Sequence, residues 1–104
     1  LYIMTLGQKQ RRFTRLVAML IDYAYMKGYE LSFGDAWAKD GHKDGSLHYD
    51  RLAIDLNLFL NGEYLTTTSQ HSFLGEFWEN LDDHCTWGGR FRSKDGNHYS
   101  YGER

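Results

Sequence analysis

The stretch RLAIDLNLFLNG, residues 51–62, decides the fold of this chain. From Arg51 to Leu60 apolar residues return at every second position, which predicts a strand with one apolar face. Asn61-Gly62 is the strongest two-residue signal for a hairpin, so residues 63–66 are predicted to form the return strand. Asp55 is unexpected inside this strand, because neither β-propensity nor burial favours a carboxylate there. It lies either on the exposed face of an edge strand or in a functional site.

The sequence on either side of this hairpin predicts two helices. Thr5-Leu6-Gly7-Gln8 fits a capping box, in which Thr and Gln satisfy each other's free backbone amides. An apolar stripe at helical spacing continues from there to a stop at Lys27-Gly28. A second, shorter stripe over residues 73–81 predicts the other helix.

The remaining segments complete a prediction of the fold class. Residues 29–33 alternate like a half-buried strand, and residues 34–45 form a loop rich in Gly, Asp and Lys. Phe91 and residues 98–101 are candidate pieces of a last strand. The order of elements predicts an α+β fold: a single small domain over residues 1–104, with an antiparallel sheet flanked by two helices.

Composition narrows the class of protein. A chain of 104 residues is one domain by the usual length prior. Its net charge of −2 disfavours a nucleic-acid partner, and with it a metal-dependent nuclease. The single cysteine, Cys85, excludes an internal disulfide, and we expect a buried or incidental thiol.

The sequence also gives expectations for the cellular location and the oligomeric state of the protein. No apolar run approaches the roughly 18 residues of a membrane span, so we expect no membrane insertion. No signal peptide is apparent, and we expect synthesis in the host cytoplasm, action on the cell wall after release by another agent, and a monomer. Met4 is a candidate native start, which would make residues 1–3 a non-native extension.

Three residues could hold a metal ion together. His48 lies seven residues before Asp55, just ahead of the strand, and His98 opens the last strand piece. Two imidazoles and a carboxylate, with one position left open for water, form a common catalytic zinc set. Asp95, three residues before His98, is placed to act as a base on that water. The chain holds five histidines, so spacing alone allows other triplets.

Two segments carrying these residues resemble the motifs of a known family. Residues 46–56, SLHYDRLAIDL, closely resemble the Ser-x-His-x6-Asp motif of the zinc D-Ala-D-Ala carboxypeptidase and dipeptidase family. That family includes VanY-type enzymes and the L-alanyl-D-glutamate peptidases of phage endolysins. Residues 87–91, WGGRF, followed by residues 95–99, DGNHY, are similar to its second motif, and the likeness runs from Leu31 onward. The resemblance implies a zinc ion (Zn2+) held in the sheet by His48, Asp55 and His98, with Asp95 as the catalytic acid/base.

The resemblance also implies a peptidoglycan stem peptide as substrate. It favours an L-Ala–D-Glu endopeptidase of a phage or prophage lysis enzyme, with a D-Ala–D-Ala carboxypeptidase as the alternative. A wall-binding module that holds metal without turnover is a further alternative, although a closed structural site would need no base such as Asp95. The candidate substrate-binding residues beside the motifs are Ser46, Tyr49, Arg51, Trp87, Arg90 and Tyr99.

The chain departs from the family at two places. Many members carry a substrate-steadying arginine in the segment matching residues 34–38, where Ala38 stands here; Lys39, Arg51 and Arg90 are the candidate replacements. Many members also have glycine at the position of Arg51. His42 is expected to be an exposed loop residue.

Overall fold

The alternating strand predicted from residues 51–60 is the centre of the sheet. A computed structural model describes residues 3–42 and 45–102. The elements are α1 (Leu6–Met26), β1 (Glu30–Phe33), β2 (Ala53–Leu60), β3 (Glu63–Leu65), α2 (Thr68–Glu79), β4 (Cys85–Trp87), the 3-10 turn η1 (Gly88–Arg90) and β5 (His98–Tyr101). The strand order is β1-β2-β5-β4, with β3 also pairing with β2, and every pairing is antiparallel. The predicted α+β class, with an antiparallel sheet and two helices, is confirmed.

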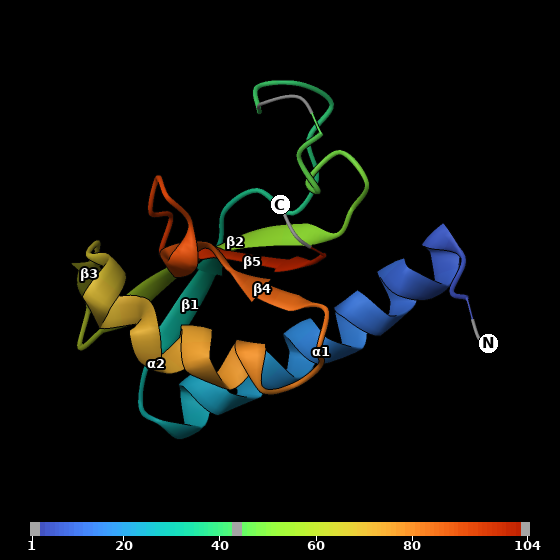
Figure 1. Ribbon diagram of the computed structural model, residues 1–104. Coiled ribbons are helices and arrows are strands. Elements are labelled where there is room, and N and C mark those ends of the chain that lie inside the picture. Colours follow the sequence, from blue (N-terminus) through green and yellow to red (C-terminus); the bar gives the residue numbers. More distant parts are fainter. Residues whose placement is uncertain (1–2, 43–44, 103–104) are drawn as a thin grey trace.

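Both helices lie against one face of the sheet (Figure 1). Leu56 and Leu58 point from β2 toward them and are fully buried, as is Leu20 of α1. The indole of Trp78 in α2 is also buried, and its Nε1 donates to the carbonyls of Thr86 and Ser100, both at 3.1 Å. Each buried leucine contributes about 1.5–3 kcal/mol relative to exposure. Because this face takes the aliphatic side chains, the alternate residues of β2 face away from the helices.

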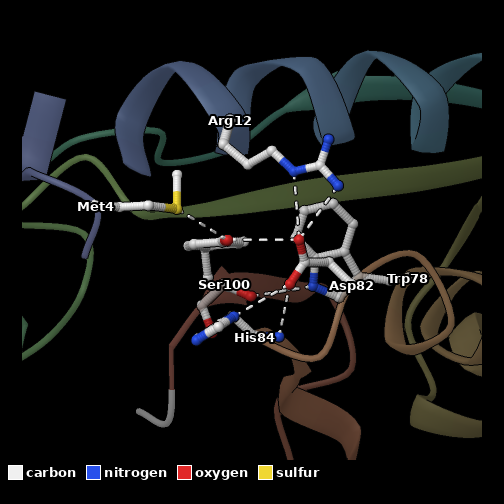
Figure 2. A network of polar contacts seen from close by, with 7 residues as sticks. Met4, Arg12, Trp78, Asp82, His84 and Ser100 are labelled. Atoms are coloured by element: carbon white, nitrogen blue, oxygen red, sulfur yellow. Dashed lines mark hydrogen bonds and ion pairs between the residues drawn. The ribbon is translucent and has the colours of Figure 1, made fainter. Parts of the chain in front are cut away.

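The Asp82 carboxylate links α1 to strand β5 of the sheet (Figure 2). Asp82 Oδ2 accepts from the Arg12 guanidinium at 3.2 Å and from the Tyr101 hydroxyl at 3.4 Å. Its Oδ1 accepts the backbone N–H of His84 at 2.9 Å. Burial raises the pKa of Asp82, but hydrogen bonds from His84 and Arg12 outweigh burial and leave that pKa below its usual value. The network therefore joins α1, the turn before β4, and β5.

The hairpin and both helix starts follow local rules. Asn61 and Gly62 have φ of 51° and 79°, the left-handed values that a two-residue hairpin turn of type I′ requires. The predicted capping box of Thr5 and Gln8 is present in α1. An equivalent box, Thr67 with Gln70, starts α2 earlier than the apolar spacing alone indicated.

Several predicted boundaries are corrected. The strand predicted from Arg51 begins at Ala53, because Arg51 has a left-handed φ of 57° and closes a turn. Phe33 is 70% exposed rather than half-buried, so β1 presents an apolar side chain to solvent. Phe91 is not a strand residue, since its N–H is held by the carbonyl of Gly88 in η1. The short strand β4 was not predicted. No helix in the described part of the chain is long and apolar enough to cross a membrane.

Trp87 is a core residue, not part of the substrate pocket wall as predicted. Its side chain is buried, and its Nε1 donates to the carbonyl of Gly96 at 2.7 Å. A Cβ on Gly75 would lie 2.1 Å from the indole, and a Cβ on Gly89 would lie 2.2 Å from it. The two glycines therefore leave the space in which the indole sits.

Gly75→Ala tests this packing. Alanine raises helix propensity by about 1 kcal/mol, but the added methyl collides with a ring that is fixed on both sides. We expect a net loss of about 1–3 kcal/mol in the free energy of unfolding, measured by urea denaturation. Glu76→Ala, an exposed change in the same helix, should stay within about 0.5 kcal/mol. A Gly75→Ala protein as stable as the wild type would contradict the packing.

Cys85 should be chemically silent in the folded protein. Burial, and secondarily the charge of Asp82, raises the pKa of its thiol to about 12, so little thiolate exists at pH 8. Iodoacetamide at pH 8, followed by mass spectrometry, should label the urea-unfolded chain fully while native protein stays largely unlabelled. Equal labelling rates would contradict the buried placement.

Candidate metal centre

The register between β2 and β5 places two of the predicted ligands side by side. Asp55 and His98 are direct cross-strand partners, so their side chains emerge on the same face of the sheet. Their neighbours Ile54 and Tyr99 are also partners and are buried. Since successive residues of a strand point to opposite faces, Asp55 and His98 share the face turned away from the helices.

His48 reaches this face from a tight turn just before β2. The Arg51 N–H bonds the His48 carbonyl at 3.2 Å, and the Leu52 N–H bonds the Leu47 carbonyl at 2.9 Å. Arg51 completes the turn in the left-handed region, with φ of 57°. Glycine adopts this φ without strain, whereas a side chain such as that of Arg51 rarely does. Ser46 Oγ accepts the backbone N–H of His48 at 3.3 Å and steadies the same turn.

The three side chains converge at metal-binding distances. His48 Nε2 lies 3.3 Å from Asp55 Oδ1, and His98 Nδ1 lies 3.4 Å from the same oxygen. One ligand atom from each residue lies within 4.8 Å of the other two. In a tetrahedral zinc site with bonds of about 2.0–2.1 Å, neighbouring ligand atoms are about 3.3 Å apart. The two distances to Asp55 therefore match the edges of such a site.

Three polar atoms of the triad are buried and make no hydrogen bond with the described residues, although the two imidazoles lie close to the carboxylate. Asp55 Oδ1 accepts no hydrogen bond from the described residues, and the outer nitrogens His48 Nδ1 and His98 Nε2 have no partner there either. Burial raises the pKa of Asp55, but interactions with the two imidazoles outweigh it and lower that pKa to about 2. The carboxylate is thus ionised at neutral pH, and an anion beside two imidazole nitrogens suits a divalent cation.

The triad opens into a cleft of about 340 Å³. Its lining includes His42, Ser46, His48, Lys94, Asp95 and His98. The predicted acid/base and two of the predicted ligands therefore share one cavity. Lys94 was not among the residues chosen from the sequence, although it stands next to Asp95.

The backbone at Asp95 is fixed by its neighbours. Its N–H donates to the carbonyl of Gly88 at 2.9 Å, and its carbonyl accepts the N–H of His98 at 3.2 Å. A Cβ on Gly88 would lie 2.2 Å from the Asp95 carbonyl oxygen, so only glycine allows this approach. Trp87 holds Gly96 through its indole N–H. The turn that carries Asp95 is therefore tied to both β4 and η1.

His42 was expected to be an exposed loop residue, but it lies in the wall of the cleft. Its ring stacks on that of His48 with centroids 4.3 Å apart. Its ring Nε2 lies 3.1 Å from Asp35 Oδ2, and its backbone N–H donates to the Tyr49 hydroxyl at 2.8 Å. The Asp35 carbonyl in turn accepts the Asp55 N–H at 2.8 Å. Position in the loop ahead of His48 was the only sequence signal for this placement.

Most of the predicted substrate-binding residues lie elsewhere. Tyr99 is fully buried on the helix side of the sheet and packs edge-on against Trp78, so the placement of Tyr99 in the substrate site is corrected. Trp87 is in the core, as described above. Tyr49 supports His42 through its hydroxyl and does not line the cleft. Ser46 does line it.

The candidate replacements for the family arginine are also outside the cleft. The Arg51 guanidinium stacks on the Trp37 ring at 4.8 Å, over a separate apolar pocket beside α1. Arg90 is exposed and donates to both carboxylate oxygens of Glu79. Lys39 is exposed and does not line the cleft. The basic side chains at the cleft are instead Lys94 and the histidines.

Comparison with known proteins agrees with the motifs. No curated protein matches this chain. A sequence profile of the family described as D-alanyl-D-alanine carboxypeptidase matches residues 39–101, which is more than half of the chain and includes the triad and Asp95. The chain therefore belongs to the family of VanY-like D-alanyl-D-alanine carboxypeptidases, as the resemblance of its two motifs predicted.

Proposed function

We propose that this protein is a zinc-dependent hydrolase that cuts peptide bonds in peptidoglycan stem peptides. The observation that carries the proposal is the convergence of His48, Asp55 and His98 at a cleft that two of them line together with Asp95. Peptidases of this family are zinc-dependent in general, and they act on peptidoglycan. A ligand set of two imidazoles and one carboxylate is typical of catalytic rather than structural zinc, because it leaves a coordination position for water.

The chain's own residues supply positioning and proton transfer. Bound zinc would act as a Lewis acid toward the scissile carbonyl and lower the pKa of a water. His48, Asp55 and His98 are set by a turn and two paired strands, so little reorganisation is needed for binding. The Asp95 carboxylate accepts the water proton and then gives a proton to the leaving amine, as a general base and acid.

We place the scissile bond between L-Ala and D-Glu, in an enzyme of the phage lysis type that reaches the wall after release. The support for this choice is the resemblance of residues 46–56, 87–91 and 95–99 to the motifs of a family that includes the endolysin peptidases. Carboxypeptidase action on D-Ala–D-Ala is the second candidate, favoured by the description of the family whose profile matches. Mass spectrometry of fragments released from purified peptidoglycan separates the two, since only the second releases free D-alanine.

Removing a ligand should abolish tight metal binding. We expect one zinc per chain in the wild type, and at least about 100-fold weaker binding in His48→Ala and in Asp55→Asn, because losing a direct ligand exceeds the 10–100-fold cost of losing its support. Competition with a chromophoric chelator measures the affinity. His84→Ala changes an exposed histidine outside the site and should bind zinc like the wild type. Unchanged affinity in both ligand variants would exclude this metal site.

Asp95→Asn should separate metal binding from catalysis. The amide cannot take a proton, so we expect full zinc content with kcat lowered about 10²–10⁴-fold on purified peptidoglycan. Asp83→Asn, an exposed change outside the cleft, is the matched control and should retain activity. Equal hydrolysis by Asp95→Asn and wild type would rule out Asp95 as the acid/base.

A further inference from the structure

No hydrogen bond from the described residues fixes the outer edge of the His48 ring. A histidine that binds a metal through one ring nitrogen commonly donates the N–H of its other nitrogen to a carboxylate, a carbonyl or a water, and this bond sets the orientation of the ring. In His48 the nitrogen turned away from Asp55 is Nδ1, which is buried and has no partner in the described part of the chain. The orientation of this imidazole therefore has to come from the groups that pack against it.

The ring of His42 packs flat against that of His48. The two imidazoles lie nearly parallel, with an interplanar angle of 18° and centroids 4.3 Å apart. The ring of His98 instead meets His48 edge-on, at 71° and 5.2 Å. A flat neighbour opposes rotation of the His48 imidazole about the bond to its Cβ, because rotation would turn an edge of the ring into the ring of His42. Stacking can therefore do what the missing hydrogen bond would do.

His42 is itself fixed, although it lies in a loop. The Tyr49 hydroxyl accepts the backbone N–H of His42 at 2.8 Å and donates to the carbonyl of the same residue. Because Tyr49 directly follows His48, these two bonds tie the loop to the turn that carries the ligand. On the other side, the His42 Nε2 lies 3.1 Å from Asp35 Oδ2, and the Asp35 carbonyl accepts the backbone N–H of the ligand Asp55 at 2.8 Å. His42 is thus held from both segments that carry these ligands.

We propose that His42 is a positioning residue of the metal centre, and that the face of its ring holds the His48 imidazole in the orientation that binds zinc. The inference rests on the proposed function, since it concerns the same metal. Nε2 of His42 is engaged by Asp35, and the part of the side chain that His48 meets is the flat face of the ring. A flat ring without nitrogen should therefore preserve this role, whereas a side chain without a ring should lose it.

Two substitutions at position 42 separate the ring face from its nitrogens. Competition with a chromophoric chelator should show zinc binding about ten-fold weaker in His42→Ala, the lower end of the cost of removing the support of a ligand, and His42→Phe should restore most of this loss. His84→Ala is the matched control and should bind zinc like the wild type, because His84 also pairs with an aspartate, at 3.2 Å, and stacks on Tyr101, but outside the site. Equal affinity in His42→Ala and the wild type, or equal weakening in both His42 variants, would overturn the positioning role.

The metal-free protein gives a second readout, which depends on neither zinc nor catalysis. A stacked ring moves the NMR signals of protons over its face upfield. The ring C–H signals of His48 should therefore lie further downfield in His42→Ala than in the wild type, and should remain upfield in His42→Phe. Signals of His48 at the same position in His42→Ala and the wild type would overturn the stack.

Activity on purified peptidoglycan separates positioning from contact with the substrate. Below saturating zinc, fewer chains of His42→Ala are loaded, so the apparent kcat should fall while KM stays that of the wild type, and added zinc should relieve the loss. A raised KM that added zinc does not relieve would mean that His42 contacts the substrate, and would overturn positioning as its role. If the wild type binds zinc but releases no fragments, the proposed function fails, while zinc affinity and the His48 signals still decide the role of His42. A wild type that binds no zinc would overturn both.

Discussion

The antiparallel register of β2 and β5 is the constraint on which the rest of the molecule depends. It sets Asp55 opposite His98 on one face and Ile54 opposite Tyr99 on the other. A slip of one residue would move the carboxylate into the apolar layer and the aliphatic side chains into the cleft. Burial of Ile54, Leu56 and Tyr99 against the helices opposes that slip. The same register therefore forms the core and the metal centre, because apolar side chains and ligands alternate along β2 and β5.

Around this pair, the chain uses positions of restricted backbone or space to bring the other groups near. Arg51 adopts a left-handed φ to end the turn that delivers His48. Gly88 allows the carbonyl of Asp95 to approach closely, and the Trp87 indole fixes the next residue through a hydrogen bond. These features lie in the turns before β2 and β5. The cleft is thus formed by two short turns on the sheet, and a cation bound at the triad would satisfy the buried Asp55 Oδ1.

The central strand and the metal ligands could be predicted from the sequence, whereas the loops around the cleft could not. Strand β2, its hairpin, helix α1 and the triad were predictable, because each depends on local alternation, capping or a recognisable motif. The placement of Tyr99 was predictable and was missed: a residue adjacent to His98 in a strand must point to the opposite face. Strand β4 has three residues, too few for a periodic signal, so no local pattern marked Trp87 as a core residue. The roles of His42 and Lys94 depend on contacts between loops that no local pattern encodes.

The central claim is that two histidines and one aspartate form a zinc site on this sheet, and zinc K-edge X-ray absorption of the metal-loaded protein tests it most directly. We expect a first shell of four nitrogen and oxygen atoms at about 2.0–2.1 Å, with outer-shell scattering from two imidazoles. A sulfur neighbour at about 2.3 Å would instead implicate Cys85, the chain's single cysteine, and would contradict the account. A shell of six oxygen atoms without imidazole scattering would contradict it equally.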